Sequence, residues 1–260
     1  MQSLPPGGFV ELDDSELRHA CSVLRMSAGS QAVVFDGSGR EAVVRFQSVS
    51  KRSAEVVIES ICEADRELPG TLTIAAALPK GDRQKTLIDG LTELGVTRLI
   101  PLITHRGVAQ PVDSALDRLR RGVIEASKQC TRTRLMQITE PMSVRSLAES
   151  ASDSTASTLR PARFVAHPYP LSDGSAQPTR LRDAVTSTSS SDVTIAIGPE
   201  GGFTDEEVQE LHAAGWRLIG LGSRLLRIEI AALSAAAQAA AALEQVAELN
   251  PQGQGDLPCA

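Results

Sequence analysis

Two glycine-rich stretches in the last third of the chain carry the residues best suited to hold a ligand. The first, Gly198-Pro-Glu-Gly-Gly202, follows an apolar run at 193–197 that is typical of a buried strand. Thr204-Asp-Glu-Glu207 then has the pattern of a capping box, which predicts that a helix begins there. The second stretch, from Leu221 to Glu229, repeats this plan after an apolar run at 216–221. Turns of this kind after neighbouring strands are where open α/β sheets hold ligands.

The charges around the first turn limit the kind of ligand. Glu200 lies in the turn, and the carboxylates of Asp205, Glu206 and Glu207 follow in the first turn of the expected helix. Such carboxylates suit a helix start but repel a polyphosphate. Neither of the common phosphate-loop patterns, G-x-G-x-x-G and G-x-x-x-x-G-K-[ST], occurs in the chain. An uncharged or cationic ligand suits the site better, and S-adenosylmethionine, with its sulfonium and ammonium groups, is one such ligand. Either turn alone would more often be a structural corner, but the pair favours a binding site.

The two stretches resemble the motifs of a known family. Gly198-Pro-Glu-Gly-Gly202 and Leu221-Gly-x-x-Leu-Leu-Arg-x-Glu-x-Ala231 resemble those of the ribosomal RNA small subunit methyltransferase E family. Further segments match in the same order along most of the chain: Arg18-His19 with Val23-Leu-Arg25, Leu78-Pro-Lys-Gly-Asp82 leading to Glu93-Leu-Gly-Val96, and Glu125-Ala126 with Gln129 and Arg132. The chain departs from the family pattern at Ile228 and Ile230, where threonine is usual, and at Ser223, where proline is common. These departures put in question any role for the missing hydroxyls.

The resemblance implies both an activity and a fold. Members of this family are SPOUT (α/β-knot) enzymes that use S-adenosylmethionine to methylate N3 of one uridine in 16S ribosomal RNA. We therefore expect an α/β protein with a PUA-like β-barrel RNA-binding domain at 1–70. A trefoil-knotted methyltransferase domain is expected at 71–250, followed by a disordered tail at 251–260. The resemblance also implies a homodimer, because the last helix of that class packs across the subunit interface.

The apolar pattern independently predicts two kinds of structure. Upstream of residue 70 it predicts short strands that form a small barrel or sheet, at 31–35, 41–46 and 54–58. Beyond that point apolar strands alternate with amphipathic helices, which is typical of a parallel sheet covered by helices. The strands are expected at 71–77, 98–103 and 162–166, and the helices at 82–94 and 112–129. The Ser-, Thr- and Asp-rich stretches at 143–160 and 171–192 predict a weak helix and mobile loops.

The candidate site residues follow from the motifs. Arg227 ends the second turn, so it is our candidate for stabilising negative charge on the uracil. Glu229 or Glu200 could accept the N3 proton, provided that its surroundings made it basic enough. Alternatively, Arg227 and Glu229 only cap and pair at the start of the last helix. The expected cofactor-binding residues are His167, Gly198, Pro199, Glu200, Gly201, Gly202, Leu221, Gly222, Leu225, Leu226 and Arg227.

The charge distribution suggests where RNA would bind. The whole chain has a net charge of −6, but residues 71–140 hold 11 basic and 7 acidic side chains, a local charge of +4. The clusters at 118–121 and 128–134 could neutralise phosphates, or could be a solvated helix face. Because only 3% of residues are aromatic, we expect shape and backbone contacts to dominate over stacking. The candidate RNA-binding residues are Arg18, His19, Arg25, Arg120, Arg121, Arg132 and Arg134.

Other features of the sequence indicate a soluble, cytoplasmic protein with free thiols. The four cysteines are widely spaced, and the four histidines are scattered, so we expect no metal. No signal-peptide pattern is visible, and the most apolar run, 231–243, is too short to span a membrane. The expected partner is the 16S RNA of the small ribosomal subunit. Two alternatives remain open: a SPOUT-type ribose 2′-O-methyltransferase, and a non-catalytic RNA-binding factor in ribosome assembly.

Overall fold

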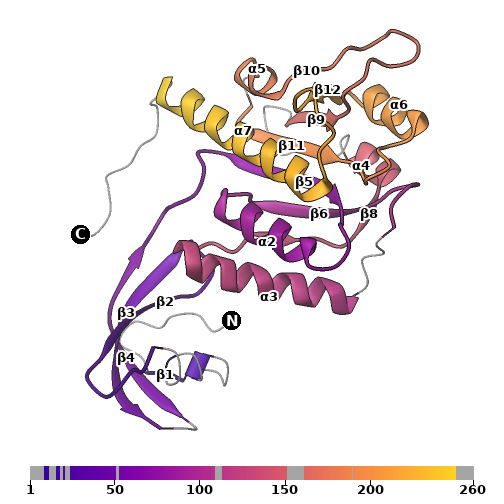
Figure 1. Cartoon of the computed structure of the whole chain (residues 1–260). Coiled ribbons are helices and arrows are strands. Elements are labelled where there is room, and N and C mark those ends of the chain that lie inside the picture. The colour runs from indigo at the N-terminus through magenta and orange to yellow at the C-terminus, as the bar shows by residue number, and fades with distance from the viewer. Residues whose placement is uncertain are drawn as a thin grey trace. The chain divides into compact units, whose positions relative to one another are not determined.

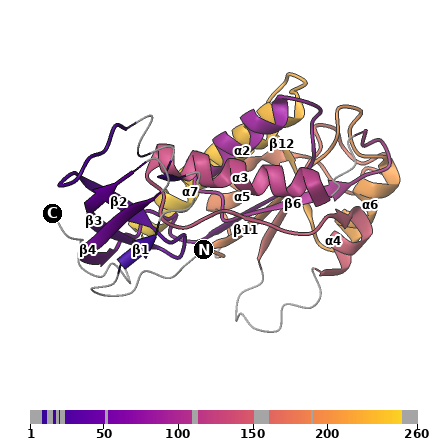
Figure 2. The same cartoon turned by 90° about the horizontal axis from the view of Figure 1, so that it is seen from below.

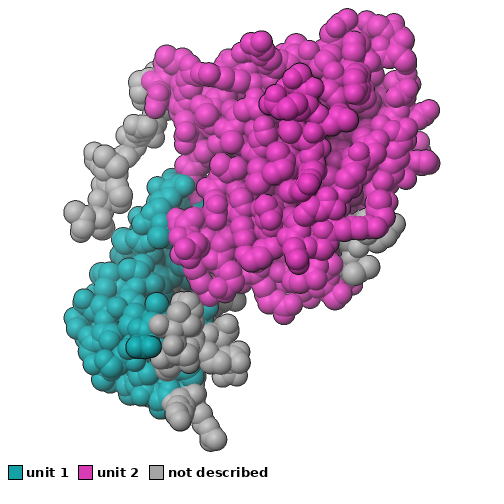
Figure 3. Space-filling view, viewed as in Figure 1, with its two compact units in different colours: residues 1–66, 131–134, 254–260 teal, residues 67–130, 135–253 magenta. Residues whose placement is uncertain are grey.

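The computed structural model describes residues 9–11, 16–17, 20, 24–50, 53–108, 113–150, 161–188 and 190–249. The chain divides into two compact units, which Figure 3 shows in different colours. Unit 1 comprises residues 1–66, 131–134 and 254–260, and unit 2 comprises 67–130 and 135–253. Arg18, His19 and the expected tail at 251–260 lie outside the described residues.

Unit 1 is built on a four-stranded antiparallel sheet in the order β1-β4-β3-β2. The strands are β1 (Phe9–Glu11), β2 (Gln31–Phe35), β3 (Arg40–Val49) and β4 (Ala54–Glu63). Alternate side chains of β3 and β4, including Val44, Phe46 and Val56, are buried together in the core of the unit. The three strands expected from the sequence are confirmed, and β3 and β4 extend beyond the expected limits because they stay paired there, as between Arg40 and Glu63.

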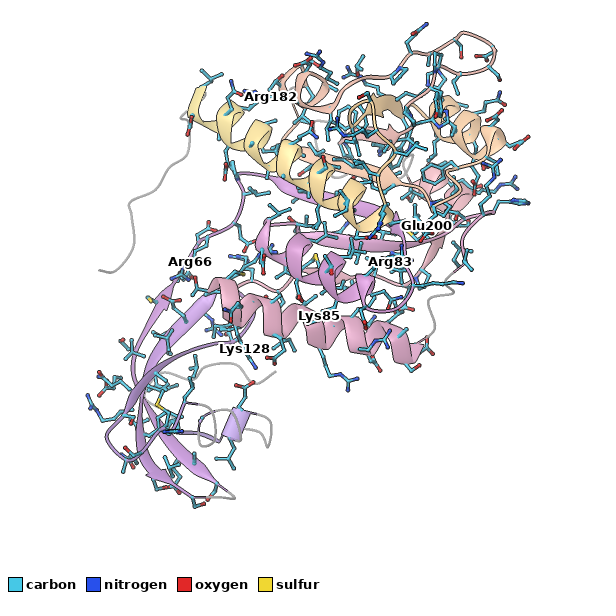
Figure 4. All side chains as sticks on the ribbon, viewed as in Figure 1. Arg66, Arg83, Lys85, Lys128, Arg182 and Glu200 are labelled. Atoms are coloured by element: carbon cyan, nitrogen blue, oxygen red, sulfur yellow. The ribbon has the colours of Figure 1, made fainter. Side chains whose placement is uncertain are left out.

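A short segment from the middle of the chain, Thr131–Arg134, also belongs to unit 1. The Thr133 carbonyl accepts a hydrogen bond from the amide of Gly39 (3.2 Å), and its hydroxyl donates to the carbonyl of Ala64 (2.7 Å). Arg66, labelled in Figure 4, donates to the carbonyl of Thr131 (3.2 Å). Within this segment Arg132 is only 4% exposed. The prediction that Arg132 belongs to a basic surface cluster at 128–134 is therefore wrong, because the side chain of Arg132 is buried.

Unit 2 is built on a parallel sheet of eight strands (Figure 1). Their order is β10-β12-β9-β11-β5-β6-β7, and β8 also pairs with β6. All the pairings between the described strands of this sheet are parallel, as the alternating pattern predicted. The strands are β5 (Thr71–Ala77), β6 (Arg98–Ile103), β7 (Gln137–Ile138), β8 (Met142–Ser143), β9 (Ala162–Ala166), β10 (Thr179–Arg180), β11 (Asp192–Ile197) and β12 (Arg217–Gly220).

Helices cover both faces of this sheet, because successive side chains of a strand point to opposite faces. Ile195 of β11 packs in the cluster under α2, α3, α5 and α7, whereas Ala196 packs in the cluster under α4 and α6. Figures 1 and 2 show the helices of each face from two directions. The helices are α2 (Arg83–Glu93), α3 (Asp113–Cys130), α4 (Val144–Ser150), α5 (Leu181–Thr186), α6 (Asp205–Ala213) and α7 (Ile228–Leu249).

Helix α7 is long and apolar enough, by length and composition, to span a membrane. In unit 2 its alanines, among them Ala232, Ala235 and Ala239, are fully buried in the core cluster that covers β5 and β11. Small side chains let a helix lie close to its neighbours, and Leu233 of α7 indeed meets Gly90 of α2. The apolar composition of α7 is therefore what a core helix of this sheet requires.

Candidate active site

Three loops meet at one edge of the sheet because the strands before them are parallel neighbours. Strand β9 lies between β12 and β11, with Ala166 opposite Ile219 and Val165 opposite Ala196. The amide of His167, directly after β9, donates to the carbonyl of Ile219 (3.0 Å). The loops that begin at 167, 198 and 221 therefore leave the sheet side by side. This brings together both glycine-rich turns and His167, at the carboxyl ends of the strands, where ligands bind open α/β sheets.

The loop after β11 is a tight turn shaped by its glycines. The amide of Gly202 donates to the carbonyl of Pro199 (2.8 Å), and Gly202 has a φ of 70°, which favours glycine. A Cβ at Gly198 would lie 3.0 Å from the backbone nitrogen of Phe203. Gly201 has no positive φ, and a Cβ there would meet only the side chain of Arg106, at 3.3 Å. The turn therefore depends on Gly198 and Gly202 more than on Gly201.

Neighbouring elements hold this loop in place. Arg106, after β6, donates from Nη1 to the carbonyls of Gly201 (2.9 Å) and Phe203 (3.3 Å). Glu207 completes the predicted capping box with Thr204, and its second oxygen accepts a hydrogen bond from the amide of His105 (2.8 Å). The loop after β6 is thus joined to the second half of the turn and to the first turn of α6.

Glu200 forms an ion pair with Arg83, the first residue of α2, with Nη1 and Oε1 3.2 Å apart. Figure 4 labels both residues, whose side chains lie close together beside the start of α2. Both side chains remain about two-fifths exposed, so solvent weakens the pair. The carboxylate that was expected to contact the cofactor or the N3 proton therefore already has a cationic neighbour.

The loop after β12 is open. Gly222 has a φ of 117°, and a Cβ there would meet nothing within 4 Å. Leu225 is 84% exposed, and Arg227 is also exposed just before α7 begins. Glu229, in the first turn of α7, is only 3% exposed, and its Oε2 has no hydrogen-bond partner among the described residues. Arg227 is therefore available to a ligand, whereas Glu229 is enclosed.

The loop after β9 forms a small hollow of about 140 Å³. The rings of His167 and Tyr169 lie edge to face, with their centroids 5.9 Å apart. Burial lowers the pKa of His167, and the carboxylate of Asp205 acts in the opposite direction. The net effect lowers the pKa of His167 and so favours its neutral imidazole. The hollow is lined by His167, Tyr169, Pro170, Leu171, Ser172 and Asp205.

The candidate RNA-binding residues are divided between the two units. Arg120 on α3 pairs with Asp117 and Glu140 at 3.1 Å each, and Arg121 on the same helix is exposed. In unit 1, Arg25 is exposed with a φ of 53°, and Arg134 is exposed beside Gly39. Of the basic residues expected to contact RNA, these four are described and reach the surface.

Sequence reasoning missed Arg83, Arg106 and Tyr169. Arg106 follows strand 98–103, so its place at the ligand edge could have been inferred from the rule that parallel strands end at one edge. Tyr169 is the chain's single tyrosine and follows strand 162–166 by three residues. The pairing of Arg83 with Glu200 joins residues far apart in sequence, and no local pattern signals it.

Comparisons with known proteins agree with this geometry. The family described as "RNA methyltransferase domain" matches residues 66–240, and "RNA methyltransferase PUA domain" matches residues 12–59. Ribosomal RNA small subunit methyltransferase E of Synechocystis is 32% identical over 236 residues, covering 90% of this chain and 74% of that protein. This chain belongs to the ribosomal RNA small subunit methyltransferase E family. The Bacillus subtilis member is 31% identical over 239 residues, which cover 90% of this chain and 90% of that protein.

Solved structures of similar proteins share the fold. A putative methyltransferase from Legionella pneumophila, in complex with S-adenosylmethionine, has a TM-score of 0.81 at 30% identity, covering 93% of this chain and 95% of that one. Methyltransferase E from Neisseria gonorrhoeae, also bound to S-adenosylmethionine, has a TM-score of 0.77 at 27% identity, covering 95% and 94%. The α/β fold with a PUA-like domain is thus that of the methyltransferase E family, and the chain is an rRNA methyltransferase.

Proposed function

We propose that this protein methylates N3 of a uridine in 16S ribosomal RNA of the small ribosomal subunit, with S-adenosylmethionine as the methyl donor. The observation that carries the proposal is the meeting of three loops at the carboxyl ends of β12, β9 and β11, in a chain of the methyltransferase E family. Two similar proteins have solved structures with S-adenosylmethionine bound. The acidic surroundings of the first turn, with Glu200 and Asp205, suit this cationic cofactor.

The three loops provide the proposed cofactor site. Backbone groups of the tight turn at 198–202 face the ligand, since the bare glycines let it approach closely. The open loop with Gly222 closes the site from the other side. The other residues proposed to contact the cofactor are Pro199, Glu200, Leu221, Leu225, Leu226 and Arg227. His167, which the sequence also suggested for this set, borders the site in the loop after β9.

The chemistry is a methyl transfer between two aligned atoms. The N3–H bond gives up its proton, and the N3 electron pair forms a bond to the methyl carbon. The methyl–sulfur bond breaks with its electron pair left on sulfur, so the sulfonium becomes a neutral thioether. Arg227, exposed at the end of its loop, is placed to stabilise negative charge that develops on the uracil oxygens. Glu200 and Glu229 stay our proposed groups for positioning or accepting the proton.

RNA contacts are proposed at the basic side chains that reach the surface. Arg121 on α3 and Arg25 and Arg134 of unit 1 are exposed, and Arg120 shares its charge with two carboxylates. Phosphate contacts by such residues bind RNA without reading its sequence. Arg18 and His19 stay predictions from the resemblance. Arg132 is left out of this set because it is buried.

Finer features of the architecture are also proposed. We infer a trefoil knot from the path of the chain. After β12, which lies on the far side of β9 from β11, the chain returns across the sheet, and α7 packs on β5 and β11. Closure of the N-terminal sheet into a barrel, the domain limits at 1–70 and 71–250, and a cytoplasmic location rest on the resemblance. A homodimer is supported by Leu225 and Ile230, which are exposed apolar side chains on either side of the start of α7.

Methyl transfer to purified ribosomal particles tests this function. Labelled S-adenosylmethionine is incubated with the protein and with small subunits from a strain that lacks the enzyme. We expect label in 16S RNA of these subunits, and none in subunits from the wild-type strain, where the site is already methylated. Cofactor binding without any transfer to either preparation would favour the assembly-factor alternative and would contradict the proposal.

A further inference from the structure

The target base must bind next to the methyl donor. N3 lies on the Watson–Crick edge of uracil, so the base must be unpaired before it can react. Proteins that bind an unpaired base commonly stack it on an aromatic side chain and hydrogen-bond its Watson–Crick edge. The structure should therefore hold an accessible ring close to the three loops.

Among the Phe, Tyr and Trp side chains of unit 2, only one meets this requirement. Unit 2 contains four such residues in sequence, and all four are described. Phe164, Phe203 and Trp216 are buried in the two clusters that cover the sheet. Tyr169 is 59% exposed. A large exposed ring in a protein with so few aromatics needs a reason, and Tyr169 lies three residues after the central strand of the site.

The surroundings of Tyr169 form a small receptor. Its ring meets that of His167 at an angle of 79°, which leaves a corner between two flat surfaces. The hollow beside them is completed by Leu171 and by Asp205, the first residue of α6. His167 is itself fixed by its backbone hydrogen bond to Ile219 of β12. The hollow therefore opens next to the turn at 198–202, which leads directly into α6.

The ionisation of His167 suits contact with N3. Burial favours its neutral form, with the nearby Asp205 opposing. A neutral imidazole has one nitrogen that accepts a hydrogen bond. By contrast, Glu200 is paired with Arg83, and Glu229 is enclosed. Among the described residues of the three loops, His167 is thus a proton acceptor that borders an open hollow.

We propose that Tyr169 and His167 form the seat of the target uracil, with the base stacked on Tyr169 and N3–H directed at the His167 imidazole. This inference rests on the proposed function and adds the recognition of the base to it. The N3 proton passes to the imidazole nitrogen while the N3 electron pair takes the methyl group. The sulfonium leaves as a neutral thioether, and the imidazolium then gives its proton to water. Glu200 and Glu229 act in this scheme by positioning rather than as the base.

Three variants and two controls separate stacking, proton transfer and cofactor binding. Tyr169→Ala removes the ring and Tyr169→Phe restores it, whereas His167→Gln keeps a hydrogen-bonding side chain without a base. Leu249→Ala and His212→Gln are matched controls, at an exposed apolar residue and at a histidine on α6. For each variant we measure kcat and KM with unmethylated small subunits, cofactor affinity by calorimetry, and the melting temperature.

The proposal predicts a distinct result for each variant. Tyr169→Ala raises KM for small subunits by about tenfold or more, and Tyr169→Phe recovers most of this loss. His167→Gln lowers kcat by about a hundredfold, with partial recovery at high pH, where hydroxide can take the proton. Its pH–rate profile also loses the acid limb, which in the wild type lies below the ordinary histidine pKa of 6.5 because burial lowers the value. Cofactor affinity and melting temperature stay at the wild-type values.

Two outcomes would contradict the proposal that Tyr169 and His167 bind the target uracil. If Tyr169→Ala and His167→Gln both weaken binding of S-adenosylmethionine as much as they slow methyl transfer, the hollow binds the cofactor and not the base. If both retain wild-type kcat and KM, the base binds elsewhere. Neither outcome affects the proposed function, which fails only if the wild-type protein transfers no methyl group to the subunits.

Discussion

Arg106 donates a hydrogen bond from Nη1 to the carbonyl oxygen of Gly201, at 2.9 Å, and so ties the loop after β6 to the glycine turn after β11. The same nitrogen lies 3.3 Å from the carbonyl of Phe203. Two carbonyls held by one guanidinium fix the path of the turn in the absence of a ligand. A preformed turn reduces the ordering cost of binding, since less of the loop must be immobilised by the cofactor.

The first prediction concerns this contact. Arg106→Ala should weaken S-adenosylmethionine binding by about tenfold, because hydrogen bonds to a charged donor contribute about 1.5–3 kcal/mol when both partners are held. Arg106→Lys should recover only part of the loss, since a single ammonium cannot reproduce the guanidinium geometry. Calorimetry measures the affinity. Arg145→Ala, which removes a surface arginine paired with Glu210, is the control. Equal affinities for Arg106→Ala and the wild type would show that the turn needs no brace.

The second prediction concerns backbone conformation in the open loop. Gly222 has a φ of 117°, which side chains of other residues rarely adopt, although a Cβ would have free space. Gly222→Val should therefore abolish cofactor binding through a changed loop path, with the fold retained. Gly215→Val at the end of α6, where φ is 89°, imposes a similar strain away from the site. The reading would be contradicted if both variants bound the cofactor equally well in a direct titration.

The third prediction concerns RNA phosphates. Arg121 is exposed on α3, so Arg121→Glu should weaken RNA binding and reduce the salt slope by about one unit. Arg182→Glu reverses a charge on α5, where the arginine donates to Gln245, and serves as the control. Affinities for 16S RNA measured across a range of salt concentrations test this. A slope equal to the wild-type value in Arg121→Glu would identify α3 as an ordinary solvated face.

The fourth prediction concerns the charge that develops on the base. Arg227→Ala should lower the single-turnover rate by about a hundredfold, with little change in RNA affinity, because the interaction strengthens only in the transition state. Glu229→Gln separates two roles: loss of activity alone would indicate a catalytic group, and loss of stability would indicate a structural one. Melting temperatures recorded beside the rates make the distinction. An unaltered rate in Arg227→Ala would remove this residue from the mechanism.

The sequence predicted the elements with strong periodicity. Strands β5, β6 and β9 have the expected limits, and the capping box at Thr204 and Glu207 starts α6 as expected. Sequence patterns were less informative for segments whose secondary structure depends on packing against distant parts of the chain. The Ser- and Thr-rich stretches at 143–160 and 171–192 were expected to hold one weak helix and mobile loops, but each contains a helix, α4 and α5. Leu181 of α5 is fully buried against the sheet.

The candidate site was predicted in part for the same reason. Both glycine turns are local patterns, so their residues could be named, and parallel pairing brings them together. The partners of the first turn come from other elements: Arg83 from α2, and Arg106 from the loop after β6. The burial of Arg132 likewise depends on a segment that joins unit 1 from the middle of the chain. Such contacts leave no periodic trace in the sequence.

The identity of the methylated nucleoside tests the central claim most directly. Unmethylated small subunits are treated with the protein and S-adenosylmethionine, their 16S RNA is digested to nucleosides, and the products are separated and analysed by mass spectrometry. The proposed function predicts one new product, uridine methylated on the base at N3. A nucleoside methylated on the ribose 2′-oxygen, or no methylated product at all, would contradict it.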